Sequence, residues 1–254
     1  MRTLTSRALC AALLALASAE LVSAQAPATA PRAFEGSAAL GFSQTRGNAN
    51  AIATNVANKL KYTMRGWAVL QDLAFFYGEA EDKVNANFWT GGFRGERNLT
   101  PRLGMYAITR FDRNTLQGIA SRFEEGVGLG YKVVDQPRDK FNIALGASAF
   151  QQELTPGSVS TFKGNYPAAR AALDYKHLFS DVAYVQQTAE YLPNLSESEA
   201  YLVNSETSLV APFTKSLAIK MGYLIRYNAQ PPVRAGLRLK TTDTFFSTGL
   251  TYSF

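Results

Sequence analysis

The sequence predicts an all-β protein, an up-and-down antiparallel transmembrane β-barrel of about twelve strands. One observation is that apolar and polar residues alternate along successive segments, the period of a strand with one apolar and one polar face. A second is that the connections between these segments are alternately tight and long. A third is that the last segment, FSTGLTYSF, carries large apolar residues on one face and ends on Phe254.

The first 24 residues predict a secretory signal peptide. Arg2 and Arg7 precede the apolar run ALCAALLALA, and small residues around Ala24 offer a cleavage site. Residues 25–33 are expected to be a flexible lead-in, and residues 34–254 the barrel. Because Cys10 is the one cysteine of the chain, the exported protein is expected to hold no disulfide.

Each element follows from the alternation in turn. Strands are expected at residues 34–45, 52–64, 67–78, 87–98, 103–113, 121–134, 139–153, 166–178, 182–192, 199–211, 216–228 and 241–254. The segments 67–78 and 182–192 are the least regular. Tight turns are expected at 65–66, 99–102, 135–138, 180–181 and 212–215, and longer loops between the other pairs. An even strand count puts both ends of the barrel chain on the tight-turn side, which is the periplasmic side of outer-membrane barrels.

A soluble periplasmic barrel would show the same alternation, so the alternation alone does not distinguish it from a membrane barrel. Three further features favour the membrane barrel. The segments are long enough to cross a bilayer when tilted. Aromatic residues gather near the expected strand ends, as in interfacial girdles: Tyr62 with Trp67, Trp89 with Phe93, and Tyr175 with Phe179 and Tyr184. The opposite faces carry ionisable residues, which are the candidates for lining a hydrated lumen: Lys59, Asp72, Arg94, Glu96, Arg110, Asp112, Glu124, Arg170, Asp174 and Arg226.

The C-terminal strand explains the abrupt end of the chain. A barrel closes when its last strand pairs with its first, which leaves neither with an exposed edge. A terminal strand with Tyr252 and Phe254 also resembles the signal by which the barrel-assembly machinery recognises bacterial outer-membrane proteins. These two residues are therefore the candidate insertion signal, with outer-membrane lipid and lipopolysaccharide as the expected surroundings.

Charge and chemistry exclude several functions. The chain carries 26 basic and 20 acidic residues, an excess that favours anionic headgroups or solutes. No Lys/Arg cluster suggests nucleic acid. The single histidine, His177, precedes an expected tight turn, where an interfacial role is simpler than a catalytic dyad with Ser180. We therefore expect no enzyme activity, no metal site and no cofactor.

Several stretches together resemble a bacterial family of salt-induced outer-membrane proteins, catalogued as domain of unknown function 481. They are GFSQTRGNAN at 41–50, RFDR at 110–113, GVGLGY at 126–131, YLIRYNAQPP at 223–232 and KTTDT at 240–244. The segment 233–239 departs from the family by being longer and less polar. The resemblance covers essentially the whole mature chain and implies an outer-membrane barrel, with no catalytic residue to carry over.

Two functions remain open from the sequence. The first is a pore for small hydrophilic solutes, since twelve strands lie between the filled eight-stranded barrels and the wide porins. The second is a non-conducting structural or stress-related barrel, closed by ion pairs such as Arg110 with Asp112 or Glu124. The glycines at 126, 128 and 130 either make room for a bulky neighbour or widen the lumen. Solute and oligomeric state stay open.

Overall fold

The computed structural model describes residues 33–46, 51–80, 83–115, 117–160, 164–180 and 183–254. The expected signal peptide and the lead-in up to residue 32 lie outside the described residues. Across those described ranges, we find no helix with the length and apolar character needed to cross a membrane.

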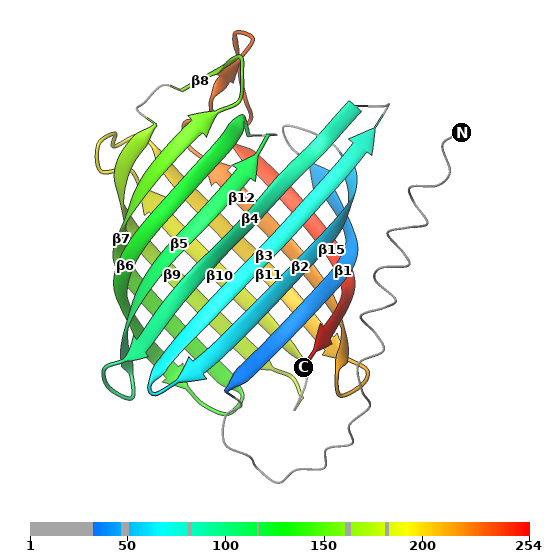
Figure 1. The fold of residues 1–254 in the computed structure, drawn as a ribbon, viewed down its shortest axis with the longest axis vertical. Helices are drawn as coiled ribbons and strands as arrows, with labels where there is room; N and C mark the ends of the chain where they lie inside the picture. Colours follow the sequence, from blue (N-terminus) through cyan, green and yellow to red (C-terminus); the bar gives the residue numbers. More distant parts are fainter. Residues whose placement is uncertain (1–32, 47–50, 81–82, 116, 161–163, 181–182) are drawn as a thin grey trace. The chain divides into compact units, whose positions relative to one another are not determined.

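Twelve long strands form one closed antiparallel barrel, as expected (Figure 1). They are β1 (Phe34–Arg46), β2 (Ala51–Met64), β3 (Trp67–Ala80), β4 (Lys83–Asn98), β5 (Leu103–Asn114), β6 (Ile119–Asp135), β7 (Asp139–Leu154), β9 (Asn165–Leu178), β10 (Tyr184–Pro193), β11 (Tyr201–Pro212), β12 (Leu217–Asn228) and β15 (Thr242–Ser253). Each of these twelve strands pairs with the one before it and the one after it in this series, and β15 returns to pair with β1. The closing register runs from Ser37 opposite Ser253 to Arg46 opposite Thr244, so the barrel has no free edge.

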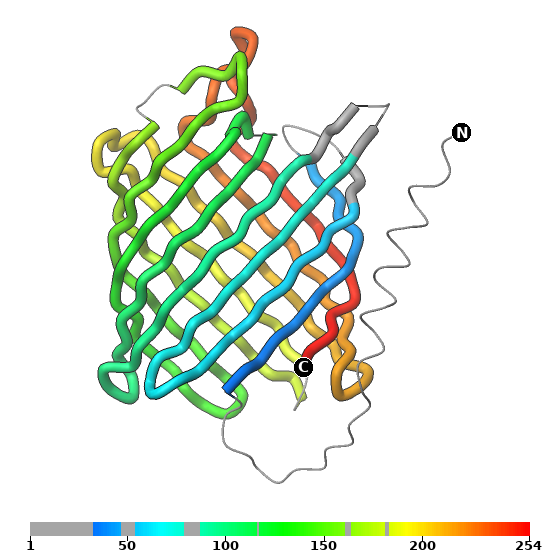
Figure 2. The backbone as a smooth tube through the Cα atoms, in the orientation of Figure 1, coloured from blue at the N-terminus to red at the C-terminus, as the bar shows by residue number. Residues whose placement is uncertain are grey.

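The strands are joined at one end by tight turns, visible at the lower end of the tube in Figure 2. Between β2 and β3, Arg65 and Gly66 adopt φ of 45° and 82°, the backbone of a two-residue hairpin that follows the strand twist. Two other turns are held by the same kind of side-chain hydrogen bond. The hydroxyls of Thr100 and Thr214 accept hydrogen bonds at 2.9 Å from the backbone N–H of Leu103 and Leu217, which holds each turn closed.

Two of the loops at the opposite end, between β7 and β9 and between β12 and β15, pair with each other. A small second sheet forms from β8 (Ser158–Val159), β13 (Val233–Arg234) and β14 (Leu237–Arg238). The β13–β14 hairpin turns at Ala235 and Gly236, with φ of 49° and 79°. The segment that departs from the family resemblance is therefore a hairpin that reaches the loop between β7 and β9 (Figure 1).

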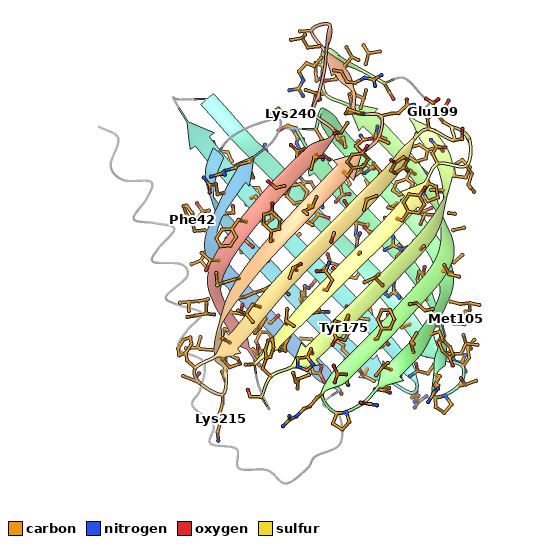
Figure 3. The ribbon with its side chains drawn as sticks, turned by 180° about the vertical axis from the view of Figure 1, so that it is seen from behind. Phe42, Met105, Tyr175, Glu199, Lys215 and Lys240 are labelled. Atoms are coloured by element: carbon orange, nitrogen blue, oxygen red, sulfur yellow. The ribbon has the colours of Figure 1, made fainter. Side chains whose placement is uncertain are left out.

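Alternation places large apolar side chains outside the barrel. Phe93, Val127 and Leu145 are 59 %, 62 % and 64 % exposed, and similar side chains surround the barrel, among them Phe42 and Met105 in Figure 3. Charged and hydroxylated residues occupy the inner face. An exterior this rich in exposed apolar surface suits hydrocarbon rather than water.

Candidate lumen and its closure

A cavity of about 1120 Å³ occupies the part of the lumen nearest the tight turns. Glu35, Lys61 and Arg102 border it at the turn end. Its other end is bounded by Phe88, Phe245, Arg110, Arg170 and Arg226. We call this cavity the vestibule.

An aromatic cluster lies at the loop-side end of the vestibule. Phe76, Phe88 and Phe245 come from β3, β4 and β15, and their ring centroids lie 5.4 to 6.1 Å apart. Phe88 and Phe245 are only 1 % and 2 % exposed. The Arg226 guanidinium lies 4.3 Å from the centre of the Phe88 ring, a cation–π contact that joins the cluster to the charged residues beside it.

A first ion-pair network crosses the lumen next to this cluster. Arg170 on β9 contacts the Glu124 carboxylate on β6 at 2.6 Å and also pairs with Glu190 on β10. Ser148 donates a hydrogen bond to Glu124 at 2.8 Å, and Arg110 lies 3.4 Å from Glu190. Because both carboxylates hold several donors, their burial is compensated.

A second network lies closer to the loops. Arg122 on β6 donates to Asp112 on β5 at 3.1 Å, and Arg226 approaches the same carboxylate at 4.0 Å. The side chains of Arg122 and Asp112 are 6 % and 11 % exposed. Together, the two networks and the aromatic cluster form what we call the packed layer.

The expected partners of Arg110 were wrong. Arg110 stands directly opposite Glu124 in the β5–β6 register, yet its guanidinium reaches Glu190 instead. Glu124 is already engaged by Arg170 and Ser148, and Asp112 by Arg122. Glu190 could not be found from adjacent strands, because its contact with Arg110 reaches across the lumen from β10 to β5. Arg122, by contrast, lies directly opposite Asp112 in the β5–β6 register and was simply not paired with it.

The remaining candidate lumen residues lie on the wall of the vestibule. Lys59 and Asp72 face each other across β2 and β3. Arg94 pairs with Glu96, and its guanidinium lies 3.9 Å from the centre of the Tyr106 ring. Asp174 accepts a hydrogen bond from Gln186 at 2.6 Å.

Gly128 on β6 and Gly146 on β7 make room for Tyr106. A Cβ atom at Gly128 would lie 2.5 Å from the Tyr106 hydroxyl, and one at Gly146, directly opposite, would lie 2.6 Å from it. Tyr106 is 3 % exposed. The missing side chain of Gly128 therefore makes room for a bulky ring, which is the first of the two roles that the sequence left open for these glycines.

The chain terminus is tied into the barrel. The backbone of Phe254 exchanges hydrogen bonds with Gly36 at 3.1 and 3.0 Å, and its ring lies 6.0 Å from those of Phe34 and Tyr252. Tyr252 and Phe254 are 47 % and 46 % exposed. They belong to an outward aromatic group at the tight-turn end.

The residues around the β9–β10 turn divide between the two faces. His177 contacts Asp139 at 2.8 Å and packs edge-on against Phe179, while the Ser180 hydroxyl accepts from the Ala183 N–H. Tyr184 was expected in the outer girdle, but its ring lies 3.6 Å from the ammonium of Lys176 on the inner face. The irregular pattern of this segment concealed its phase, and a shift of one residue reverses the face of a strand residue.

Solved structures with a similar fold include porins. The NanC porin aligns with a TM-score of 0.56 and 10 % identity, over 85 % of this chain and 98 % of that one. A KdgM porin in complex with disordered oligogalacturonate aligns with a TM-score of 0.46 and 9 % identity, over 85 % and 99 % of the two chains. An anion-selective porin from Comamonas acidovorans aligns with a TM-score of 0.45 and 10 % identity, over 87 % and 98 %. Among curated proteins, none matches this chain.

The fold and the site thus define a closed twelve-stranded barrel with a charged lumen, in the same fold as a porin. The model of the family described as "Protein of unknown function, DUF481" matches residues 38–254. The chain belongs to that family, which confirms the resemblance found in its sequence.

Proposed function

We propose that this protein is an outer-membrane barrel pore for small hydrophilic solutes, closed on its loop side by the packed layer. The observation that carries the proposal is the contrast along the lumen. The vestibule offers about 1120 Å³ bounded by charges of both signs, whereas Phe88 and Phe245 at its loop-side end and Arg122 beyond them are at most 5 % exposed. Solutes enter from the tight-turn side, and passage requires the packed layer to open.

The outer membrane as its location rests on the exterior of the barrel. Its apolar band, flanked by aromatic residues, fits lipid on all sides, and the paired C-terminal strand fits recognition of Tyr252 and Phe254 by the barrel-assembly machinery. Lipopolysaccharide is the expected neighbour at the loop end.

Single-channel conductance in planar bilayers tests the pore. The wild-type barrel is expected to stay closed for long periods, with discrete, salt-dependent steps when it opens. Phe88→Ala combined with Phe245→Ala removes two rings of the packed layer and is expected to give sustained conductance. Phe93→Ala is the matched control, because Phe93 lies on the same strand as Phe88 but faces outward. A double variant that conducts no more than the wild type contradicts the assignment of the barrier.

The buried ion pairs favour a second candidate, a permanently closed structural barrel. Arg170 and Glu124 are 6 % and 5 % exposed, so opening the layer would expose or separate well-matched charges. In that case the wild type shows no steps at any voltage, while the Phe88 and Phe245 double variant conducts.

A further inference from the structure

Apart from the exposed Lys140, which lies opposite Lys176 on the inner face, five exposed basic residues lie in the tight turns or on the outer face beside them. They are Arg65, Arg97, Arg102, Arg138 and Lys215, and Figure 3 shows Lys215 on one of the turns. Among the residues that the structure describes, none of the five has an ion-pair partner. We call this set the turn-end cations.

Among the described residues beside these turns, Asp135 and Asp139 are already engaged by other side chains. Asp135 lies 4.0 Å from Lys132, and Asp139 binds His177 at 2.8 Å and accepts a hydrogen bond from the Tyr175 hydroxyl at 2.9 Å. Among the described residues, the turn-end cations therefore give this end an excess of unpaired positive charge. At the loop end, by contrast, exposed basic residues such as Arg46 and Arg113 share the surface with the exposed carboxylates Glu153 and Glu199.

Exposed apolar residues alternate with these cations. Trp67, Leu99, Phe179 and Phe213 at the same turns are 42 %, 50 %, 59 % and 57 % exposed. The Arg97 guanidinium lies 5.4 Å from the centre of the Trp67 ring. Large apolar side chains beside unpaired cations match a lipid interface, where rings lie at headgroup level and cations meet phosphate.

We propose that the turn-end cations bind anionic phospholipid headgroups, of the phosphatidylglycerol class, in the leaflet at the tight-turn end. This inference rests on the outer-membrane location proposed above. A lipid fits better than a soluble acidic partner, because Arg97 lies directly opposite Trp67 of β3 and on the same outward face of β4 as Phe93. Each engaged cation is expected to raise local headgroup affinity about fivefold.

The two tryptophans of the chain provide a local test. Trp67 lies at the tight-turn end, and Trp89, packed 4.2 Å from the Phe111 ring, lies toward the loop end. A Trp89→Phe barrel therefore reports on Trp67 alone, and a Trp67→Phe barrel on Trp89 alone. Each is refolded into phosphatidylcholine vesicles in which brominated phosphatidylglycerol or brominated phosphatidylcholine serves as the quencher.

Trp67 is expected to be quenched several-fold more efficiently by the brominated anionic lipid, and Trp89 equally by both. Changing all five turn-end cations to Gln should abolish the preference at Trp67, while Arg46→Gln with Arg113→Gln at the loop end should preserve it. Equal quenching at Trp67, or a preference that survives the five substitutions, overturns the inference. Binding of soluble polyglutamate by the turn-end cations without any lipid preference overturns it in favour of an acidic polypeptide. If neither lipid quenches either tryptophan, the barrel is not in the bilayer, and the proposed function itself fails.

Discussion

Replacing Arg170 by Met probes whether the packed layer excludes water. The substitution leaves Glu124, whose side chain is 5 % exposed, with the Ser148 hydroxyl as its remaining described donor. Glu190 keeps Arg110 and the Asn204 amide. A buried carboxylate stripped of its cation costs about 3–5 kcal/mol, which lowers the folding equilibrium by about two to four orders of magnitude.

The comparison variant is Lys61→Met. Lys61 and Glu35 also form a lumen-side pair, at 3.4 Å, but their side chains are 43 % and 47 % exposed. Water screens such a pair, so its loss should cost about 0–1 kcal/mol. Adding Glu124→Gln to Arg170→Met should recover much of the loss, because the unpaired charge is then gone.

The assay is urea unfolding in lipid vesicles, followed by the heat-modifiable gel band and extrapolated to zero denaturant. A clear separation between Arg170→Met and Lys61→Met supports a dry layer. If both variants lose less than about 1 kcal/mol, water screens the interior ion pairs as well. The lumen would then not be closed on its loop side by a dry layer.

Three further predictions concern other parts of the barrel. Gly128→Ala should lower the urea midpoint, because the new Cβ would meet the Leu145 carbonyl oxygen at 2.4 Å. Gly95→Ala, where a Cβ meets no atom within 4 Å, should leave the midpoint unchanged or raise it slightly. Equal effects of the two substitutions would contradict close packing at Gly128. Arg234→Met removes the hydrogen bonds by which the guanidinium joins the loops, so proteinase K should cleave these loops faster while the urea midpoint stays unchanged. Unaltered cleavage would show that these hydrogen bonds do not hold the loops together. Phe254→Ala should reduce the amount of folded protein in the outer-membrane fraction while refolding in vitro proceeds; undiminished assembly would remove Phe254 from the insertion signal.

The strands and tight turns could be predicted because each is encoded locally. Period-two alternation directly assigns a face to each residue, and turn residues such as Gly66 punctuate it. The assignment failed at Tyr184, where the pattern is irregular and its phase was ambiguous. Two-residue strands such as β13 carry no measurable period, so the hairpin at the loop end went unnoticed, although Gly236 is a typical turn residue.

The packed layer could not be predicted because it depends on contacts between distant segments. Phe76, Phe88 and Phe245 occur in the same alternating sequence patterns as many aromatic residues that face outward. Whether such a residue points into the lumen depends on which of the two faces its strand turns inward at that position. Glu190 could not be distinguished from other charges, because its contact with Arg110 joins two strands that are not neighbours in the barrel. Closure of a barrel sets those distances through the stagger of the strands, which no single segment encodes.

The contrast between vestibule and packed layer also determines where an applied voltage acts. A water-filled vestibule conducts ions and therefore holds nearly the potential of the solution that it joins. Most of the voltage drop then falls across the short layer that contains Phe88, Arg122 and Arg226. A unit charge that moves through the full drop gains about 2.3 kcal/mol per 100 mV, so the buried arginines, rather than the lysines of the vestibule, are the charges that a membrane potential would displace.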